Sequence, residues 1–417
     1  MSENKGGFWP WLAWFATAFF YAYQYFLQVS PSVMVKSLMR AFNADATSLS
    51  ILVSFYFWAY AFSQIPLGAI LDKFGVRRLL TASALLVAIG STLFAASHMF
   101  FLASLGRLLI GLGGGSAAIG CMYIAANAHP TNRFSILTGL LLSIGMIGAI
   151  SAQAPLAVAC EDLGWRPTIL LLSAIGLLLA ILLWTCLAKI KKTSNNTNNT
   201  ADKLWDGMRA ILKKQQIWML AAYAGLMLVP TTVFGALWGG PYLRSAYHLS
   251  NKEAATLISM IFVGWIFGAP ILGWISDRTL KRNPVMYVSA IGTLITTSLI
   301  IYLLDFTYYE LALLIFCTGF FSSGLIVAFS SAKENSSPNT TGACMGFMNG
   351  LNMLGGAILP PIIGLILDRY RILNFGVASY STHGYQISLS ILPICVFIAL
   401  ILLLFVRETN GNTINNL

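Results

Sequence analysis

Twelve apolar runs, each about 20 residues or longer, occupy most of this chain and leave short polar segments between them. A run of this length crosses the hydrocarbon core of a bilayer as an α-helix. Charged residues make up only 9% of the 417 residues, whereas a soluble domain carries about 25%. The chain is therefore predicted to be an all-α integral membrane protein that passes the bilayer many times. The predicted spans are 9–38, 47–71, 77–97, 100–126, 134–160, 166–188, 216–244, 253–275, 284–304, 309–332, 342–368 and 384–406.

Lysine and arginine are distributed unevenly between the two sets of loops that alternate along the chain. If both termini are cytoplasmic, 17 of the 25 Lys and Arg residues lie inside, seven lie outside, and Arg107 lies within a span. Cytoplasmic loops of membrane proteins carry such an excess, so both termini are predicted to be cytoplasmic. The net charge of +11 then meets anionic headgroups of the lipid bilayer and requires no nucleic-acid partner.

Residues that could build a metal centre or a catalytic dyad are scattered along the sequence. The six cysteines show no CxxC spacing and lie in or beside apolar runs, where we expect small buried hydrophobic side chains. His98, His129, His248 and His383 lie at separate predicted helix ends. A membrane-embedded enzyme would need such groups together at one depth. We therefore expect no enzymatic activity, no cofactor and no metal site.

A basic and polar segment, 189–215, divides the chain into six spans before it and six after it. Its composition predicts a cytoplasmic linker that contains a short interfacial helix near 204–212. The predicted organisation is an N-terminal six-helix bundle over 1–188, the linker, and a C-terminal six-helix bundle over 216–417.

The two halves share landmarks at nearly one offset. Asp72 follows a glycine and precedes a basic pair, and Asp277 does the same 205 residues later. Asp162 stands seven residues after a proline, and Asp368 does the same 206 residues later. Two unrelated landmarks with almost the same offset indicate an internal duplication, which is common in transporters.

Three motifs carry a resemblance to the major facilitator superfamily. The stretch "GAILDKFGVRR" at 68–78 resembles the family's signature loop, and "GWISDRTLKR" at 273–282 resembles its degenerate second copy. The stretch "RLLIGLGGGS" at 107–116 resembles the pattern of the family's fourth helix. The resemblance implies twelve helices in two pseudo-symmetric bundles around a central cavity. It also implies transport of a small-molecule substrate by alternating access, and we expect the protein to act as a monomer.

A closer resemblance involves "YQYFLQVSPSVM" at 23–34 and "FYFWAYAFSQIPLGAILDKFG" at 55–75. These stretches are similar to the phagosomal nutrient transporters of intracellular bacteria, which move amino acids or nucleosides. The resemblance implies uptake of such a nutrient across a bacterial inner membrane.

The resemblance to the major facilitator superfamily also implies a gate at the cytoplasmic side. Asp72 lies at the C-terminal end of a predicted helix, where its charge opposes the helix dipole and requires partners. In the family, the corresponding acid faces the N-terminal end of the eleventh helix, near Gly342 in this chain. A cluster of charges that only fixes membrane orientation is the alternative. The predicted gating residues are Gly68, Asp72, Arg77, Arg78, Asp277 and Arg278.

A polar and aromatic stripe follows one face of the first span. Tyr21, Gln24, Tyr25 and Gln28 fall at positions i, i+3, i+4 and i+7 of a helix. Two glutamines that faced lipid would be costly, so the stripe is expected to face protein or water. It either lines a solute pathway or joins helices through hydrogen bonds. Further candidates for substrate contact on other spans are Tyr56, Tyr60, Thr231, Trp238, Asn349 and Asn352.

Arg107 is the only charged residue well inside a predicted span. It could extend outward to the bilayer surface, or it could bind a carboxylate or phosphate of the solute. No Asp, Glu or His lies in the middle of any predicted span, so facilitated diffusion stands beside coupling to a proton. The preferred substrate is an amino acid or a nucleoside. The alternative is import or export of a carboxylate siderophore or another organic anion.

Overall fold

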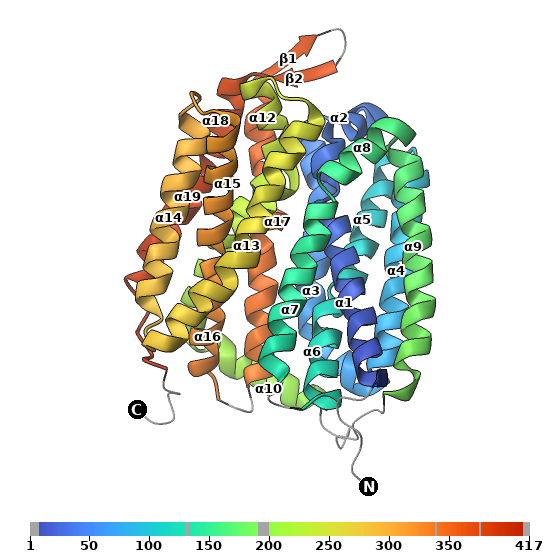
Figure 1. Ribbon diagram of the computed structural model, residues 1–417, viewed down its shortest axis with the longest axis vertical. Coiled ribbons are helices and arrows are strands. Elements are labelled where there is room, and N and C mark those ends of the chain that lie inside the picture. Colours follow the sequence, from blue (N-terminus) through green and yellow to red (C-terminus); the bar gives the residue numbers. More distant parts are fainter. Residues whose placement is uncertain (1–7, 131–132, 191–199, 338–339, 375–376, 412–417) are drawn as a thin grey trace.

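The computed structural model describes residues 8–130, 133–190, 200–337, 340–374 and 377–411. Its long helices lie side by side along one axis (Figure 1). Both termini lie at one end, here called the terminal end, and the strands β1 (Arg371–Asn374) and β2 (Val377–Tyr380) lie at the other, here called the hairpin end. This antiparallel hairpin pairs Arg371 with Tyr380 and has no counterpart among the sequence predictions.

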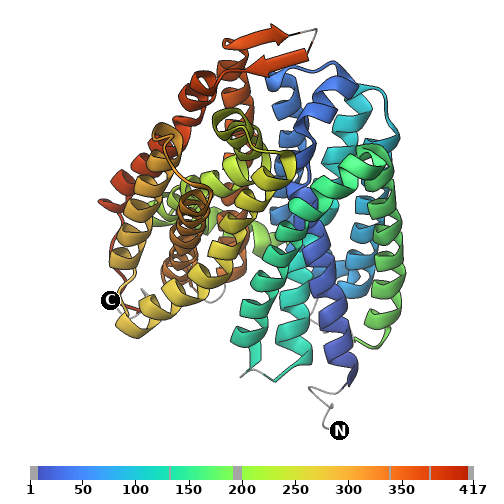
Figure 2. The same cartoon turned by 45° about the horizontal axis from the view of Figure 1, so that its top comes forward.

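Two groups of helices make up the molecule, and they lie on opposite sides of it (Figure 2). The first group contains α1 (Phe8–Val29), α2 (Pro31–Phe42), α3 (Ala46–Phe74), α4 (Val76–Ala96), α5 (Phe100–Gly114), α6 (Ser116–Ala128), α7 (Phe134–Ser151), α8 (Ala154–Leu163), α9 (Trp165–Cys186) and η2 (Leu187–Lys189). The second contains α11 (Gln215–Val229), η4 (Pro230–Trp238), α12 (Gly239–Tyr247), α13 (Asn251–Thr279), α14 (Asn283–Tyr302), α15 (Tyr308–Ser322), η5 (Ser323–Leu325), α16 (Ile326–Glu334), α17 (Thr341–Asp368), α18 (Thr382–Leu389) and α19 (Ile391–Leu403). The predicted fold of two helical bundles is therefore confirmed.

The predicted spans correspond to the helices, although several spans are interrupted. In the described residues, eleven continuous helical stretches are long and apolar enough to cross a membrane. The first predicted span is not among them, although α1 has 22 residues and extends along the bundle. Its Trp, Tyr and Gln residues lower its hydropathy. Pro31, at the first position of α2, separates the two helices of this span.

The predicted linker contains one α-helix, α10 (Thr200–Leu212), within its described residues. This helix includes the predicted interfacial helix at 204–212. The linker residues 191–199 lie outside the described part of the chain. The predicted domain limits, 1–188, 189–215 and 216–417, stay predictions.

Side-chain caps define where several helices begin. The Asp45 carboxylate accepts a hydrogen bond of 2.8 Å from the backbone N–H of Ser48 at the start of α3. Helix α13 begins with a reciprocal capping box between Ser250 and Glu253. These caps satisfy backbone N–H groups at the hairpin end, where the first turn of each helix has no intrahelical acceptor.

Helices α3 and α17 form the central contact between the bundles. They are antiparallel, and the glycines of α17 allow the two backbones to approach closely. A Cβ atom on Gly350 would lie 3.2 Å from the carbonyl oxygen of Ala61, and one on Gly364 would lie 2.6 Å from that of Ala46. Small residues therefore determine how the bundles fit together.

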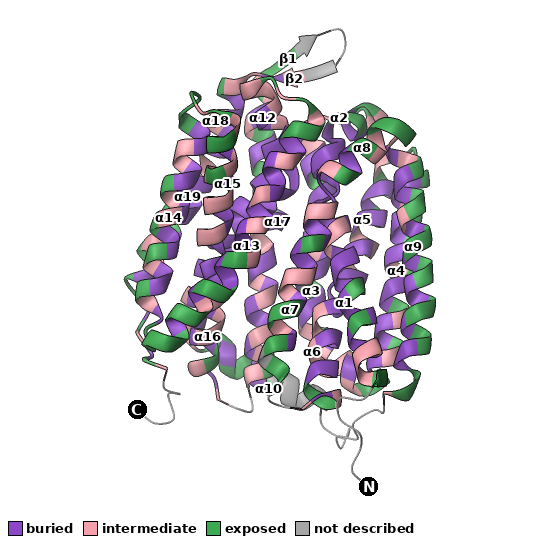
Figure 3. Ribbon diagram, viewed as in Figure 1, coloured by how far each residue is buried: buried purple, intermediate pink, exposed green. Residues whose placement is uncertain are grey.

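The outer faces of the bundles are exposed, as Figure 3 shows for α9 and α14, and many of their exposed side chains are apolar. On α9 the exposed residues include Leu171, Leu178 and Ile181. A continuous apolar surface of this kind fits contact with lipid acyl chains. The structure therefore agrees with a multi-pass membrane protein.

Replacing Gly148 with alanine should destabilise the first bundle. The added Cβ atom would lie inside van der Waals contact with the carbonyl of Ala22, where α7 crosses α1. Overpacking of this kind typically costs about 1–3 kcal/mol. The measurement is thermal unfolding in detergent. The matched control is Gly139→Ala on the same helix, where the new atom meets no heavy atom of the described residues within 4 Å. Equal midpoints for the two variants would contradict the packing argument.

Candidate functional site

A polar cluster lies inside the first bundle, where α1, α3 and α5 meet. Gln24 donates a hydrogen bond of 3.0 Å to Gln28 Oε1 and a second, short one to the hydroxyl of Tyr56. Tyr56 in turn donates to Gln28 Oε1 over 3.3 Å. All three side chains are buried. In this conformation the glutamines of the predicted stripe join α1 to α3.

Arg107 lies beside this cluster and is completely buried. Its Nη1 donates a hydrogen bond of 2.9 Å to the carbonyl of Leu27, and its guanidinium lies 5.0 Å from the centre of the Tyr56 ring. Its Nε and Nη2 have no hydrogen-bond partner, and Arg107 forms no salt bridge with any described residue. Of the two alternatives for Arg107, extension to the bilayer surface does not agree with this burial, and contact with a solute anion stays a prediction.

Two properties of α5 hold Arg107 in the interior. The helix begins at Phe100 near the hairpin end, so Arg107 lies two turns inside the bundle. Glycines at the next turns bring α5 against its neighbours, since Gly111 contacts the backbone of Tyr56 and Gly114 lies against the side chain of Gln24. An uncompensated buried charge costs several kcal/mol. Among the described residues, Arg107 therefore keeps two N–H-bearing nitrogens that could still donate to an anion or a strong acceptor.

Three further predicted residues lie near the bundle interface. Tyr21 and Tyr25 contact edge to face with ring centres 5.0 Å apart, and their hydroxyls are 3.5 Å apart. Tyr60 packs beside Tyr56, with ring centres 6.1 Å apart. Each of these rings belongs to α1 or α3.

Asn349 links the two bundles. Its side-chain N–H donates a hydrogen bond of 2.8 Å to Gln64 Oε1 across the contact between α3 and α17. Asn352, one turn further along α17, is buried and its Oδ1 has no hydrogen-bond partner among the described residues. Asn349 therefore lies at the interface between the bundles, and the predicted contact of both asparagines with a solute stays a prediction.

The candidates on the second bundle lie in η4, which is a π-helix of nine residues. The indole N–H of Trp265 donates a hydrogen bond of 2.9 Å to Thr231 Oγ1. Trp238 is fully buried and its indole N–H has no partner among the described residues. Because a π-helix is wider than an α-helix, the spacing of side chains along η4 departs from 3.6 residues per turn, and the predicted substrate contacts of Thr231 and Trp238 stay predictions.

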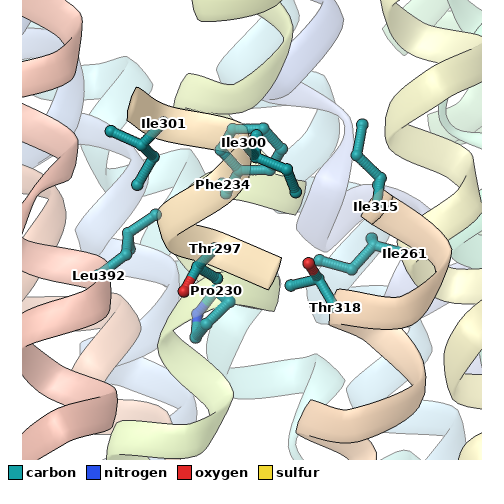
Figure 4. Close-up of a pocket in the computed structure, with 9 residues that line it drawn as sticks. All are labelled: Pro230, Phe234, Ile261, Thr297, Ile300, Ile301, Ile315, Thr318 and Leu392. Atoms are coloured by element: carbon teal, nitrogen blue, oxygen red, sulfur yellow. The ribbon is translucent and has the colours of Figure 1, made fainter. Parts of the chain in front are cut away.

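A small cavity inside the second bundle does not serve as a solute site. It lies against Pro230 and Phe234 of η4, with Thr297 and Thr318 as its polar residues (Figure 4). Its volume is about 10 Å³, close to the space of one water molecule.

The predicted gating residues of the first bundle lie where α3 turns into α4. Asp72 is two residues before the end of α3, and space is open beside Gly68. Arg77 donates a hydrogen bond of 2.9 Å to the carbonyl of Trp184, and its guanidinium lies 3.8 Å from the centre of that ring. Arg78 is exposed. Arg77 therefore fastens the turn to the end of α9.

The corresponding turn of the second bundle is held by ion pairs. Arg282 lies 2.6 Å from Asp277 and 2.6 Å from Glu334 on α16. Arg278 lies over the ring of Trp274 at 5.2 Å. Arg282 is therefore paired with two acidic residues.

Sequence reasoning missed the role of Asp368, which ends α17 at the hairpin end. Its carboxylate accepts hydrogen bonds from the backbone N–H groups of Ala46 (3.0 Å) and Thr47 (2.8 Å), the first residues of α3. The hydroxyls of Thr47 (2.6 Å) and Tyr380 (2.8 Å) also donate to it. Burial and the contact with Asp368 raise the pKa of Tyr380, so it stays a donor. The carboxylate thus caps a helix of the other bundle.

Two weaker contacts join the bundles at the same end. Asn251 at the start of α13 donates a hydrogen bond of 3.3 Å to the carbonyl of Val33. Gln153 donates to the carbonyl of Gly235 in η4 over 3.5 Å. Hydrogen bonds therefore join the two bundles at the hairpin end.

The arrangement of two helical bundles can be compared with known proteins. The sequence profile of the Major Facilitator Superfamily matches residues 13–360 and 231–416. The chain belongs to this superfamily. The prediction of the superfamily is confirmed, and the prediction of the phagosomal subfamily stays a prediction.

Relatives within the superfamily move different small solutes. The lysosomal dipeptide transporter MFSD1 of Danio rerio is 24% identical over 369 residues, which are 82% of this chain and 77% of that protein. The probable galactarate/D-glucarate transporter GudP of Bacillus subtilis is 20% identical and covers 87% of this chain and 86% of its own. A bacterial homolog of the human lysosomal transporter Spinster has the same fold, with a TM-score of 0.77, 14% identity and 99% coverage of both chains.

Replacing Tyr56 with phenylalanine should lower the free energy of unfolding by about 1–3 kcal/mol, because the buried amides of Gln24 and Gln28 lose a partner. Thermal unfolding in detergent measures the change. The control is Tyr309→Phe, which removes a hydroxyl from a residue that is 83% exposed and should change the midpoint little. A Tyr56 variant as stable as this control would show that the cluster contributes nothing to the fold.

Proposed function

We propose that this protein carries a small solute with a carboxylate group across the membrane by alternating access, with an amino acid or short peptide favoured. The observation that carries the proposal is Arg107, a fully buried guanidinium with two N–H-bearing nitrogens that lack partners. A planar guanidinium binds a carboxylate through two parallel hydrogen bonds.

The groups around Arg107 fit the rest of such a solute. Gln24 Oε1 is buried and lacks a donor, so it can accept a hydrogen bond from an ammonium or amide N–H. Tyr56 and Gln28 are neutral and amphipathic. In the present conformation protein atoms cover Arg107 and these groups, and the proposed movement of the bundles would expose them to the solute.

The relatives support a carboxylate in the solute. A dipeptide carries one, and galactarate and D-glucarate carry two, although these sugar acids lack an ammonium group. A nucleoside carries none. Of the two nutrients predicted from sequence, the amino-acid class therefore fits the unpaired guanidinium better. The predicted alternative, a siderophore or other organic anion, also fits Arg107, and a hydroxyl group of such a solute could donate to Gln24 Oε1.

The α3–α17 pair supplies two gates in this proposal. The distribution of Lys and Arg predicts that the hairpin end lies outside. There Asp368, at the C-terminal end of α17, holds the N-terminal end of α3. Because the helices are antiparallel, Asp72 near the C-terminal end of α3 occupies the mirrored position at the terminal end. We assign the outer gate to Asp368 and the inner gate to Asp72.

Thermal unfolding against a solute panel tests the substrate class. The panel contains amino acids, dipeptides, dipeptides with an amidated C-terminus, sugar acids, tricarboxylates and nucleosides. A ligand at 100 times its Kd stabilises the folded protein by about 2.7 kcal/mol. We expect a shift with free dipeptides or amino acids and none with the amidated forms. A shift only with tricarboxylates or sugar acids would favour the organic-anion alternative, and a shift with nucleosides would contradict the carboxylate.

The variant Arg107→Gln should lower uptake of the identified solute into proteoliposomes by about 100-fold or more, because a buried charged hydrogen bond is lost. Its folded yield, measured by size-exclusion chromatography, should stay near that of the parent. Arg107→Lys keeps the charge without the planar guanidinium, so its uptake rate should lie between those of the parent and of Arg107→Gln. Loss of folded protein in both variants would assign Arg107 a structural role.

The variant Asp368→Asn should open the hairpin end. Losing the charge weakens four hydrogen bonds, and we expect the labelling rate of a Ser32→Cys reporter by a membrane-impermeant thiol reagent to rise roughly tenfold. The matched control is Asp162→Asn, at the equivalent position of the first half, where the side chain is exposed. Equal labelling in the two variants would contradict the proposal that the Asp368 carboxylate holds the hairpin end closed, here called the Asp368 latch.

A further inference from the structure

A basic surface pocket lies at the terminal end, between the α3–α4 turn and the end of α9. Its volume is about 490 Å³. Lys73, Arg77 and Arg78 contribute three positive charges, and no acidic residue lines it. The remaining lining residues are Phe74, Gly75, Val76, Trp184 and Ile190. The pocket therefore combines basic and apolar side chains.

The walls of the pocket have the character of a membrane interface. Trp184 is 45% exposed and Phe74 is 48% exposed. Tryptophan favours the headgroup level of a bilayer. Leu178 and Ile181 are also exposed, and they precede Trp184 on α9 by about two turns and one turn. An exposed apolar surface therefore continues along α9 from the pocket. A ligand with a charged head and long apolar chains matches this arrangement.

The corresponding turn of the second half shows what the first half lacks. There, Arg282 is neutralised by Asp277 and Glu334. The offset of 206 places Ala128 at the position that corresponds to Glu334. Arg77 and Arg78 form no salt bridge with any described residue. The first half therefore lacks an acidic residue at the position from which Glu334 pairs with Arg282 in the second half.

We infer that this pocket binds the phosphate of an anionic phospholipid, with the acyl chains along α9. Arg77 is already oriented by its hydrogen bond to the carbonyl of Trp184 through Nε, which leaves its terminal nitrogens for the phosphate. Lys73 and Arg78 are exposed at the rim and add charge. A bound lipid would connect the turn that carries Asp72 to α9. The lipid composition of that leaflet would then act on the proposed inner gate.

Native mass spectrometry of the full chain, exchanged between micelles that contain phosphatidylglycerol or phosphatidylcholine, tests the inference. The parent should retain phosphatidylglycerol preferentially. Each basic side chain near an anionic surface contributes about a fivefold factor, so Lys73→Gln with Arg78→Gln should weaken retention about 30-fold. The matched control is Arg278→Gln with Lys281→Gln, which removes the same charge from the equivalent turn and leaves Arg282 in place.

Four outcomes decide the inference. Selective loss in the Lys73/Arg78 variant supports it, provided that thermal unfolding shows both variants folded. Equal loss in the two variants would overturn it in favour of general attraction between charges. Equal retention of both lipids by the parent would overturn it as well. Binding of glycerol 3-phosphate with the affinity of the phospholipid would assign the pocket to a soluble phosphate.

Discussion

The close antiparallel contact of α3 with α17 is the constraint on which the rest of the structure depends. Two helices from different bundles approach with little more than backbone between them, because glycines such as Gly350 and Gly364 stand where larger side chains would separate them. Lipid supplies no hydrophobic force between helices, so such a contact relies on close packing and hydrogen bonds. The contact brings Asp368 to the first turn of α3 and Asn349 to Gln64.

The polar groups inside the first bundle differ in how completely their hydrogen bonds are satisfied. Gln24, Gln28 and Tyr56 satisfy most of one another's hydrogen bonds, so they can remain in a membrane interior at moderate cost. Arg107 satisfies only one of its nitrogens from the protein. A transporter needs a site that gains from binding its solute, and an incompletely paired buried group provides that gain. Completing the pairing within the protein would stabilise the fold and, under the proposed function, weaken binding of the solute.

The apolar runs, the duplication and the signature loop predicted the fold, because span length and motif spacing are local properties of a sequence. The predicted stripe at Tyr21, Gln24, Tyr25 and Gln28 identified residues that are largely buried, but could not tell helix contacts from a pathway. The Asp368 latch was missed because its partners, Ala46 and Thr47, are more than 300 residues away. The π-helix was missed because helical periodicity assumes 3.6 residues per turn.

That π-helix has a mechanical consequence for the second bundle. It holds more residues per turn than the α-helices on either side, so it stores extra chain within a continuous helix. Displacing this wider turn by one residue rotates the side chains that it passes by about 100° without breaking the helix. Trp238, buried at the end of η4 with an unpaired indole N–H, would turn with it. In the proposed transport cycle, this rotation would reorient Trp238 within the second bundle, in addition to the movement of the two bundles relative to each other.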